Sequence, residues 1–321
     1  MSYLHATREL YRDAALKPDV GLCCTTNPTW QLPGLSIPRI MQEMNYGCGS
    51  TVSPQDLTGN PTVLYVGVGG GMELLQFAYF SRRKGGVIGV DVVEEMLEAS
   101  RANFKIAERE NDWFAEEFVE LRRGDALSLP LADASVEVAA QNCLFNIFKE
   151  ADLKRAVAEM YRVLKPGGRL VMSDPVCDVP LGEELRNDDR LRAQCLSGSI
   201  PLQDYLKVLA DAGFGTLEVR ARRLYRVLSP NHYPVQRLVP IESVEVAAIK
   251  DPMPEDGPCI FTGKTALYYG KEPCFDDGKG HVLLPNQPLS VCDKTAAALQ
   301  RTSGDIFVSE STWHYNGGGC C

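Results

Sequence analysis

A short apolar segment that runs directly into closely spaced glycines constrains the fold of this chain more than any other feature. Val63 to Val66 has the composition of a buried parallel strand, and Gly67, Gly69 and Gly71 follow it. Residues 72–80 continue with the grouped apolar side chains of a helix. Glycines at such a junction permit backbone angles that side chains forbid, and they leave helix N–H groups open to an anionic ligand. The pattern therefore predicts a strand, a turn and a helix that bind a cofactor.

A second predicted strand places a carboxylate where a nucleotide-like cofactor needs one. Val87 to Asp91 ends in an acid about twenty residues beyond the glycines, which is the position of a residue that binds ribose hydroxyls. A dinucleotide-binding loop has the spacing G-x-G-x-x-G, which requires a glycine at position 72. This chain has Met72 there and the spacing G-x-G-x-G instead. The loop therefore argues against a nicotinamide cofactor.

Later segments bring further polar side chains to the same predicted sheet edge. Asp125 and Ala126 follow a strand that starts at Val119, and Asn142 lies near the end of another that starts at Val136. The carboxyl ends of parallel strands form the ligand-binding edge of an open α/β sheet. These residues therefore extend the predicted cofactor site along one edge.

Composition restricts the partners and the compartment. The chain has 33 basic and 42 acidic residues and a formal net charge of −9, which disfavours a nucleic acid substrate. No apolar run approaches the roughly 18 residues of a membrane span. The first residues lack the apolar core of a signal peptide. We expect a cytoplasmic protein with neither a nucleic acid nor a membrane as partner.

The chain contains 11 cysteines, which a reducing compartment would keep as thiols. None of them forms the C-x-x-C spacing of zinc ribbons and fingers, so the pattern does not indicate a structural zinc site. Cys48 has glycine on both sides, which leaves its thiol open to a soft ligand. Cys23 and Cys24 are adjacent, so a disulfide between them would be strained and binding of a thiophilic atom is the better interpretation.

For three other cysteines, burial in the core is an alternative to binding a ligand. Cys143 ends a buried strand and Cys259 precedes two apolar residues, so core packing explains both at least as well as ligation does. Cys177 follows a predicted strand, and both interpretations stay open for it.

The order of these motifs resembles that of class I S-adenosylmethionine-dependent methyltransferases. In them a glycine loop, a ribose-binding acid and a Gly-Asp-Ala adenine contact bind the cofactor, and a Leu-Lys-Pro-Gly-Gly segment, here residues 164–168, precedes the fifth strand. The resemblance implies a Rossmann-like α/β fold with a seven-stranded, mostly parallel sheet, a cysteine-bearing N-terminal cap and a C-terminal extension. The implied cofactor residues are Tyr65, Gly67, Gly69, Gly71, Asp91, Val92, Asp125, Ala126 and Asn142. Tyr65 departs from the family, which usually has an acid at that position.

Several segments resemble arsenite S-adenosylmethionine methyltransferases in particular, most closely the subgroup associated with arsenosugar biosynthesis. They are residues 46–49, 141–147, 161–174, 195–199, 291–297 and the terminal 317–321. This resemblance runs nearly end to end. It implies methyl transfer to trivalent arsenic in arsenic detoxification or the arsenosugar pathway, with S-adenosylhomocysteine as product. A thiol reductant such as glutathione or thioredoxin would keep the arsenic trivalent.

The same resemblance implies the arsenic ligands. Cys48 and Cys195 match the two thiolates that bind As(III), and Cys23 or Cys24 matches an N-terminal cysteine that joins them in some members. Soft sulfur ligands select this thiophilic centre. A fourth family cysteine belongs near residues 241–250, where this chain has none.

Cysteines near the C-terminus could add to that set. Cys259 is a candidate to replace the missing fourth cysteine. Cys320 and Cys321 follow three glycines, and we expect them to capture or hand over arsenic rather than to bind it during methyl transfer. An inert tail with two solvent-exposed thiols explains the same pattern.

The chain divides into four predicted segments. They are the cap at 1–58, the cofactor-binding core at 59–178, a substrate-side segment with the last sheet strands at 179–270, and a C-terminal lobe or tail at 271–321. Strands near 216–228 and 264–269 are expected to complete the sheet.

Two other functions are compatible with these motifs. The first is a class I methyltransferase that acts on a small organic thiol, amine or carboxylate, for which a converging acid, base or aromatic pocket in the cap would be expected. The second is a thiol-based metalloid binder without catalysis. An intact cofactor pocket would count against the second.

Overall fold

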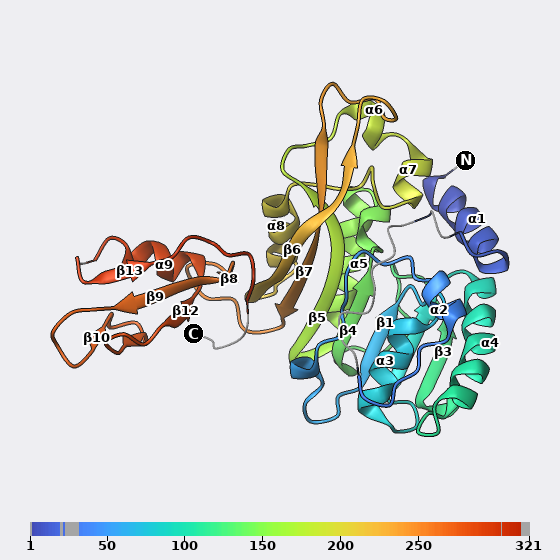
Figure 1. Ribbon diagram of the computed structural model, residues 1–321, viewed down its shortest axis with the longest axis horizontal. Helices are drawn as coiled ribbons and strands as arrows, with labels where there is room; N and C mark the ends of the chain where they lie inside the picture. The colour runs from blue at the N-terminus through green and yellow to red at the C-terminus, as the bar shows by residue number, and fades with distance from the viewer. Residues whose placement is uncertain (1, 20–21, 23–31, 303, 316–321) are drawn as a thin grey trace.

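A single mixed sheet forms the centre of the protein, and the computed structural model in Figure 1 describes residues 2–19, 22, 32–302 and 304–315. The strand order is β3-β2-β1-β4-β5-β7-β6-β8. Neighbours from β3 to β5 run parallel, whereas β7 runs antiparallel to both β5 and β6. The strands are β1 (Val63–Val66), β2 (Val87–Asp91), β3 (Val119–Arg123), β4 (Val136–Asn142), β5 (Leu164–Cys177), β6 (Thr216–Leu228), β7 (Val239–Ile249) and β8 (Cys259–Phe261). The predicted α/β fold is confirmed, with eight strands rather than seven because short β8 pairs in parallel with β6.

The strand predicted near 264–269 does not join this sheet. Residues Lys264–Tyr268 form β9, which pairs with β12 (Leu289–Val291) and β13 (Ile306–Val308) in a separate three-stranded sheet. In the central sheet β7 lies between β5 and β6, and its residues 243–249 are mostly buried, as a strand covered on both faces requires. Gly263, with a φ of +80°, turns the chain away after β8. The predicted place of this strand was therefore wrong.

Helices cover both faces of the central sheet. Leu64 and Val66 of β1 belong to one apolar cluster with residues of α5 and α8, whereas Val63 and Tyr65 belong to another with residues of α3 and α4. These helices are α3 (Met72–Ser81), α4 (Glu94–Glu110), α5 (Glu150–Val163) and α8 (Leu202–Asp211). Because the two apolar clusters cover the two faces of the sheet, a ligand can reach the sheet only at the ends of its strands.

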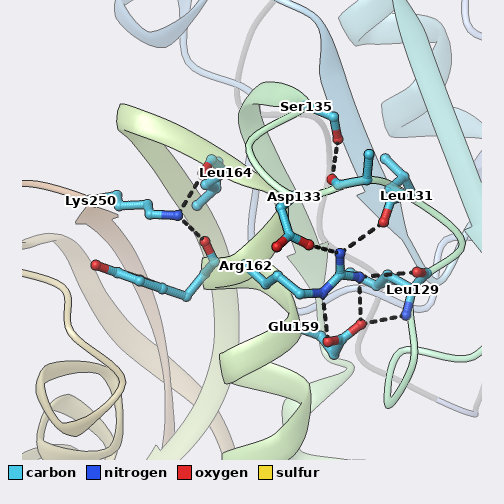
Figure 2. Close-up of polar contacts among 10 residues, drawn as sticks. Leu129, Leu131, Asp133, Ser135, Glu159, Arg162, Leu164 and Lys250 are labelled. Carbon is cyan, nitrogen blue, oxygen red and sulfur yellow. Dashed lines mark hydrogen bonds and ion pairs between the residues drawn. The ribbon is translucent and has the colours of Figure 1, made fainter.

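Arg162, near the C-terminal end of α5, holds the loop that leads into β4 (Figure 2). Its guanidinium donates to the carbonyl oxygens of Leu129 and Leu131 at 3.1 and 2.8 Å and pairs with Asp133 at 2.7 Å. Glu159 accepts from Arg162 at 2.8 Å and from the Leu129 N–H at 2.7 Å. The hydrogen bond from Arg162 holds the pKa of Glu159 below its usual range. These contacts tie the segment after β3 to the helix layer.

Two segments lie outside the sheet layers. Helix α1 (Tyr3–Leu16) packs against α4 and α7 (Asp189–Ala193), and some of its side chains reach the strand ends. The C-terminal part projects beyond β8 in Figure 1 and has its own apolar cluster around β9 and α9. The remaining elements are α1 (Tyr3–Leu16), α2 (Arg39–Glu43), α6 (Glu183–Arg186), α7 (Asp189–Ala193), α9 (Asp293–Leu299), β10 (Phe275–Asp276), β11 (Val282–Leu283), β12 (Leu289–Val291), β13 (Ile306–Val308) and the 3-10 helices η1 (Pro54–Leu57), η2 (Glu116–Phe118) and η3 (Phe145–Ile147). In the described part of the chain, no helix is long and apolar enough to cross a membrane.

Candidate active site

A cavity opens at the carboxyl ends of β1, β2 and β4. Its volume is about 790 Å³ including the open mouth. The predicted cofactor residues that line it are Tyr65, Gly67, Gly69, Asp91, Val92 and Asn142. Helix α1 contributes Thr7, Arg8 and Tyr11 from the opposite side. The cavity therefore lies between the sheet edge and the N-terminal helix.

The other predicted cofactor residues lie beside the cavity rather than in its wall. Gly71 precedes α3 with a φ of +86°, and a Cβ there would lie 2.9 Å from the Phe104 ring. Asp125 pairs with Arg8 at 3.0 Å on the exposed side of the cavity. Ala126 is buried in the apolar cluster that includes α5 and α8. Their contact with a cofactor stays a prediction.

Asp91 connects the glycine turn to the start of the next helix. Its carboxylate accepts the N–H groups of Val68 and Val93, each at 2.9 Å, and is largely buried at the cavity wall. Burial raises the pKa of Asp91 to about 6. The backbone of Gly67 and Gly69 has φ values of +85° and +52°, so the turn needs residues without a side chain.

The motifs did not single out Glu73, which lies in the first turn of α3 and lines the cavity. Its carboxylate is buried and accepts the Thr51 N–H at 2.8 Å, the Tyr65 hydroxyl at 2.5 Å and the Asn142 amide at 3.2 Å. Burial raises the pKa of Glu73 above its usual value. The available signal in the sequence was an acid two residues after the last glycine of the turn.

Asn142 connects this polar cluster to a cluster of thiols. Its side-chain oxygen accepts the Cys48 N–H at 2.9 Å, and its amide donates to the Gly49 carbonyl at 2.9 Å. A Cβ at Gly47 would lie 2.5 Å from the Asn142 amide nitrogen, so the 47–49 segment can approach Asn142 closely only because it has glycine there. The first predicted arsenic ligand, Cys48, is thus fixed beside the cavity.

Cys48, Cys143 and Cys195 come together in one buried cluster with Ile147. They lie respectively in the segment after α2, in the turn after β4 and in the loop after α7. The Cys195 thiol donates to the Cys143 carbonyl oxygen at 2.6 Å, and the Cys48 sulfur lies 3.4 Å from the Ser173 hydroxyl. Cys143 also lines the cavity. The thiol cluster is therefore continuous with the predicted cofactor site.

Two of these cysteines have an unusual backbone conformation. Cys143 and Cys195 have φ values of +59° and +58°, in the left-handed region that residues with a side chain rarely occupy. Such conformations are costly and concentrate at functional sites. Five other residues with side chains have positive φ values, including Ala134 and Trp313, so the angles are compatible with a ligand role for Cys143 but do not by themselves assign one.

The thiols are gathered but do not form a ready-made metal site. Across the described ranges, no group of three or more Cys, His, Asp or Glu side chains is arranged to bind a metal ion. The Cys195 thiol is turned toward the Cys143 carbonyl rather than toward the other sulfurs. Binding of a thiophilic atom would have to replace that hydrogen bond.

Among the described residues, the other buried cysteines lie apart from this cluster. Cys177 ends β5 with its thiol 3.4 Å from the Ser199 carbonyl, and burial raises its pKa to about 12, as expected of a packed thiol. Cys259 belongs to another cluster with Cys292, Phe261 and Tyr315, and is therefore not the fourth member of the Cys48 group. The predicted ligands Cys23, Cys24, Cys320 and Cys321 lie outside the described residues.

Comparison with known proteins identifies relatives for this arrangement. The methyltransferase domain model matches residues 64–172. Arsenite methyltransferase of Aquipseudomonas alcaligenes is 36% identical over 306 residues, which cover 87% of this chain and 82% of that protein. The arsenite methyltransferases of Halobacterium salinarum and Mus musculus are 33% and 29% identical, over 55% and 53% of this chain. The chain matches less than half of those two proteins, 43% and 44% of their lengths.

A solved structure matches almost the whole fold. It is that of an arsenic(III) S-adenosylmethionine methyltransferase from Chlamydomonas reinhardtii, with a TM-score of 0.61 and 22% sequence identity. The match covers 89% of this chain and 99% of that one. The likeness extends beyond the methyltransferase core to most of the chain.

Proposed function

This chain belongs to the arsenite methyltransferase family, and from that premise we propose that it transfers a methyl group from S-adenosylmethionine to trivalent arsenic bound by cysteine thiolates. The observation that carries the proposal is the position of Cys143. It belongs to the thiol cluster and also lines the cavity, so the two reactants would meet at one residue. Methyl transfer between two bound reactants depends mainly on such positioning.

The residues of the cavity fit S-adenosylmethionine. The Asp91 carboxylate suits ribose hydroxyls, and the bare backbone at Gly67 and Gly69 allows close approach of the cofactor. Asp125 is our candidate for the adenine amine. The cofactor supplies a methyl group on a positively charged sulfur. The chain supplies the binding site and the thiols that orient the substrate.

We assign the arsenic to Cys48, Cys143 and Cys195, which adds Cys143 to the pair predicted from sequence. Trivalent arsenic is soft and prefers thiolate sulfur, and thiols lose their protons when they bind it. The three sulfurs come from three separate segments, so the fold rather than a local motif selects them. Glutathione or thioredoxin in the cytoplasm would keep the arsenic trivalent, for detoxification or arsenosugar synthesis.

The direct test is turnover. Purified protein with S-adenosylmethionine, arsenite and glutathione is expected to release S-adenosylhomocysteine in step with methylated arsenic, both separated by chromatography. Transfer to a small organic thiol or amine with arsenite left unmethylated would point to the first alternative function. Tight arsenite binding without turnover would point to a metalloid binder.

Asp91 provides a test of the cofactor site. We expect Asp91→Asn to weaken S-adenosylmethionine binding about 10- to 100-fold in calorimetric titration, because a charged hydrogen bond is worth about 1.5–3 kcal/mol. Unchanged affinity would exclude this residue from the site.

The pH dependence of binding gives Asp91 a second readout. Its pKa of about 6 means that the carboxyl group gains a proton as the pH falls from 7 to 5 and accepts ribose hydroxyls less well. Wild-type affinity should therefore fall over that range. The Asp91→Asn variant should show a smaller fall than the wild type, since it has no proton to gain at that position.

A further inference from the structure

The Glu73 carboxylate is a buried charge without a cation. Its hydrogen bonds come from a backbone N–H, a phenol and an amide, all of them neutral. Throughout the described segments no Lys, Arg or His forms an ion pair with it. A carboxylate in such a place costs free energy unless it is paired. Burial accordingly raises the pKa of Glu73, and a positive group in the cavity would stabilise its ionised form.

Glu73 places a carboxylate close to position 65, where this chain has Tyr65 instead of the acid that is usual in class I methyltransferases. Tyr65 lies two residues before Gly67, where the methyltransferase motif has its acid, and its hydroxyl donates to Glu73. The carboxylate is thus delivered to the cavity from α3 instead of from β1. Asn142 contacts the same carboxylate from β4, so two strands and the segment that contains Thr51 hold it in place.

The charge also has room for another donor. An ionised carboxylate offers about four acceptor positions. Thr51, Tyr65 and Asn142 account for three hydrogen bonds, and Glu73 faces the cavity. An incoming ammonium group can donate a hydrogen bond to the remaining position, whereas a sulfonium has no proton to donate.

We propose that Glu73 is the counter-charge that binds the α-ammonium group of the cofactor's amino-acid portion, in place of the acid absent at position 65. This assignment rests on the proposed function, since it takes S-adenosylmethionine as the cofactor. Glu73 acts in binding rather than in proton transfer. Tyr65 and Asn142 are positioning residues, because they reach the cofactor's charge through Glu73.

The experiment compares three ligands on Glu73→Gln by calorimetric titration. S-Adenosylmethionine and S-adenosylhomocysteine both carry the ammonium group, whereas 5′-methylthioadenosine keeps the nucleoside and the thioether but lacks the amino-acid portion. We expect the variant to bind the first two about 10- to 100-fold more weakly and the third with unchanged affinity. Asp91→Asn is the matched comparison, and it should weaken all three because all three contain the ribose.

Thermal unfolding without ligand separates binding from damage to the fold. Glu73→Gln removes the buried charge and keeps the side-chain shape, but its NH2 group must face a donor that the carboxylate accepted from. A melting temperature within a few degrees of the wild type is therefore the condition under which the three affinities are compared. Weakening of S-adenosylmethionine alone would assign the charge to the sulfonium and overturn the proposal. Equal weakening of all three ligands, or of none, would also overturn it. Failure of the wild type to bind any of them would instead contradict the proposed function.

Discussion

Cys143→Ser is expected to lose arsenic methylation while it still binds S-adenosylmethionine. Serine keeps the volume but removes the soft donor, and Cys143 lies in the same cluster as Cys48 and Cys195. Loss of an outer partner of a bound metal typically costs about 10- to 100-fold, so loss of a direct ligand should cost at least that. Initial rates of methylated arsenic formation at saturating cofactor measure the effect.

Cys48→Ser and Cys195→Ser should behave in the same way, since a thiolate site fails when any ligand is removed. Cys177→Ser is the matched control, because Cys177 is equally buried but belongs to a different cluster. It should keep nearly the full rate. If the Cys143→Ser enzyme were as active as the Cys177→Ser control, Cys143 would not be an arsenic ligand and would serve only in core packing.

Gly198→Ala is expected both to destabilise the protein and to abolish most activity. A Cβ at position 198 would lie 1.7 Å from the Asn146 carbonyl oxygen, a contact that only backbone movement can relieve. Gly198 lies three residues after Cys195, and Asn146 lies three residues after Cys143. The substitution would therefore push apart the two segments that bring these thiols together. Overpacking of this kind costs about 1–3 kcal/mol of the free energy of unfolding.

Gly182→Ala serves as the control for this change. A Cβ there meets no atom within 4 Å, and its φ of −61° suits any residue. Urea unfolding should show a lower midpoint for Gly198→Ala and little change for Gly182→Ala. If both variants matched the wild type in stability and rate, the close approach of the two loops would not matter for catalysis.

The fold was predictable because its signals are local. An apolar strand, spaced glycines and a helix follow one another within the segment from Val63 to Ser81, and the acid that ends β2 follows at the usual distance. The place of β9 was not predictable in this way. Which strands become neighbours in a sheet depends on packing between distant segments, and β7 and β9 are both apolar enough to fill the position next to β6.

The site was harder to predict at residues whose sequence pattern is also common in residues without a functional role. Glu73 has the pattern of an acid in the first turn of a helix, where it usually faces solvent and favours the helix dipole. Cys143 has the pattern of a small apolar residue at a strand end. Their roles come from contacts between distant parts of the chain. Glu73 and Asn142 are 69 residues apart in the sequence, and Cys143 and Cys195 are 52 residues apart.

The left-handed backbone at Cys143 and Cys195 has a consequence for directed evolution. Each such residue costs about 1–2 kcal/mol relative to glycine at the same angles. A library selected only for heat resistance would set that cost against the cavity that a removed buried thiol leaves, and it would take no account of arsenic binding. Directed evolution of a more thermostable variant therefore needs arsenite in the growth medium at every round. Survival then depends on Cys143 and Cys195 as well as on stability.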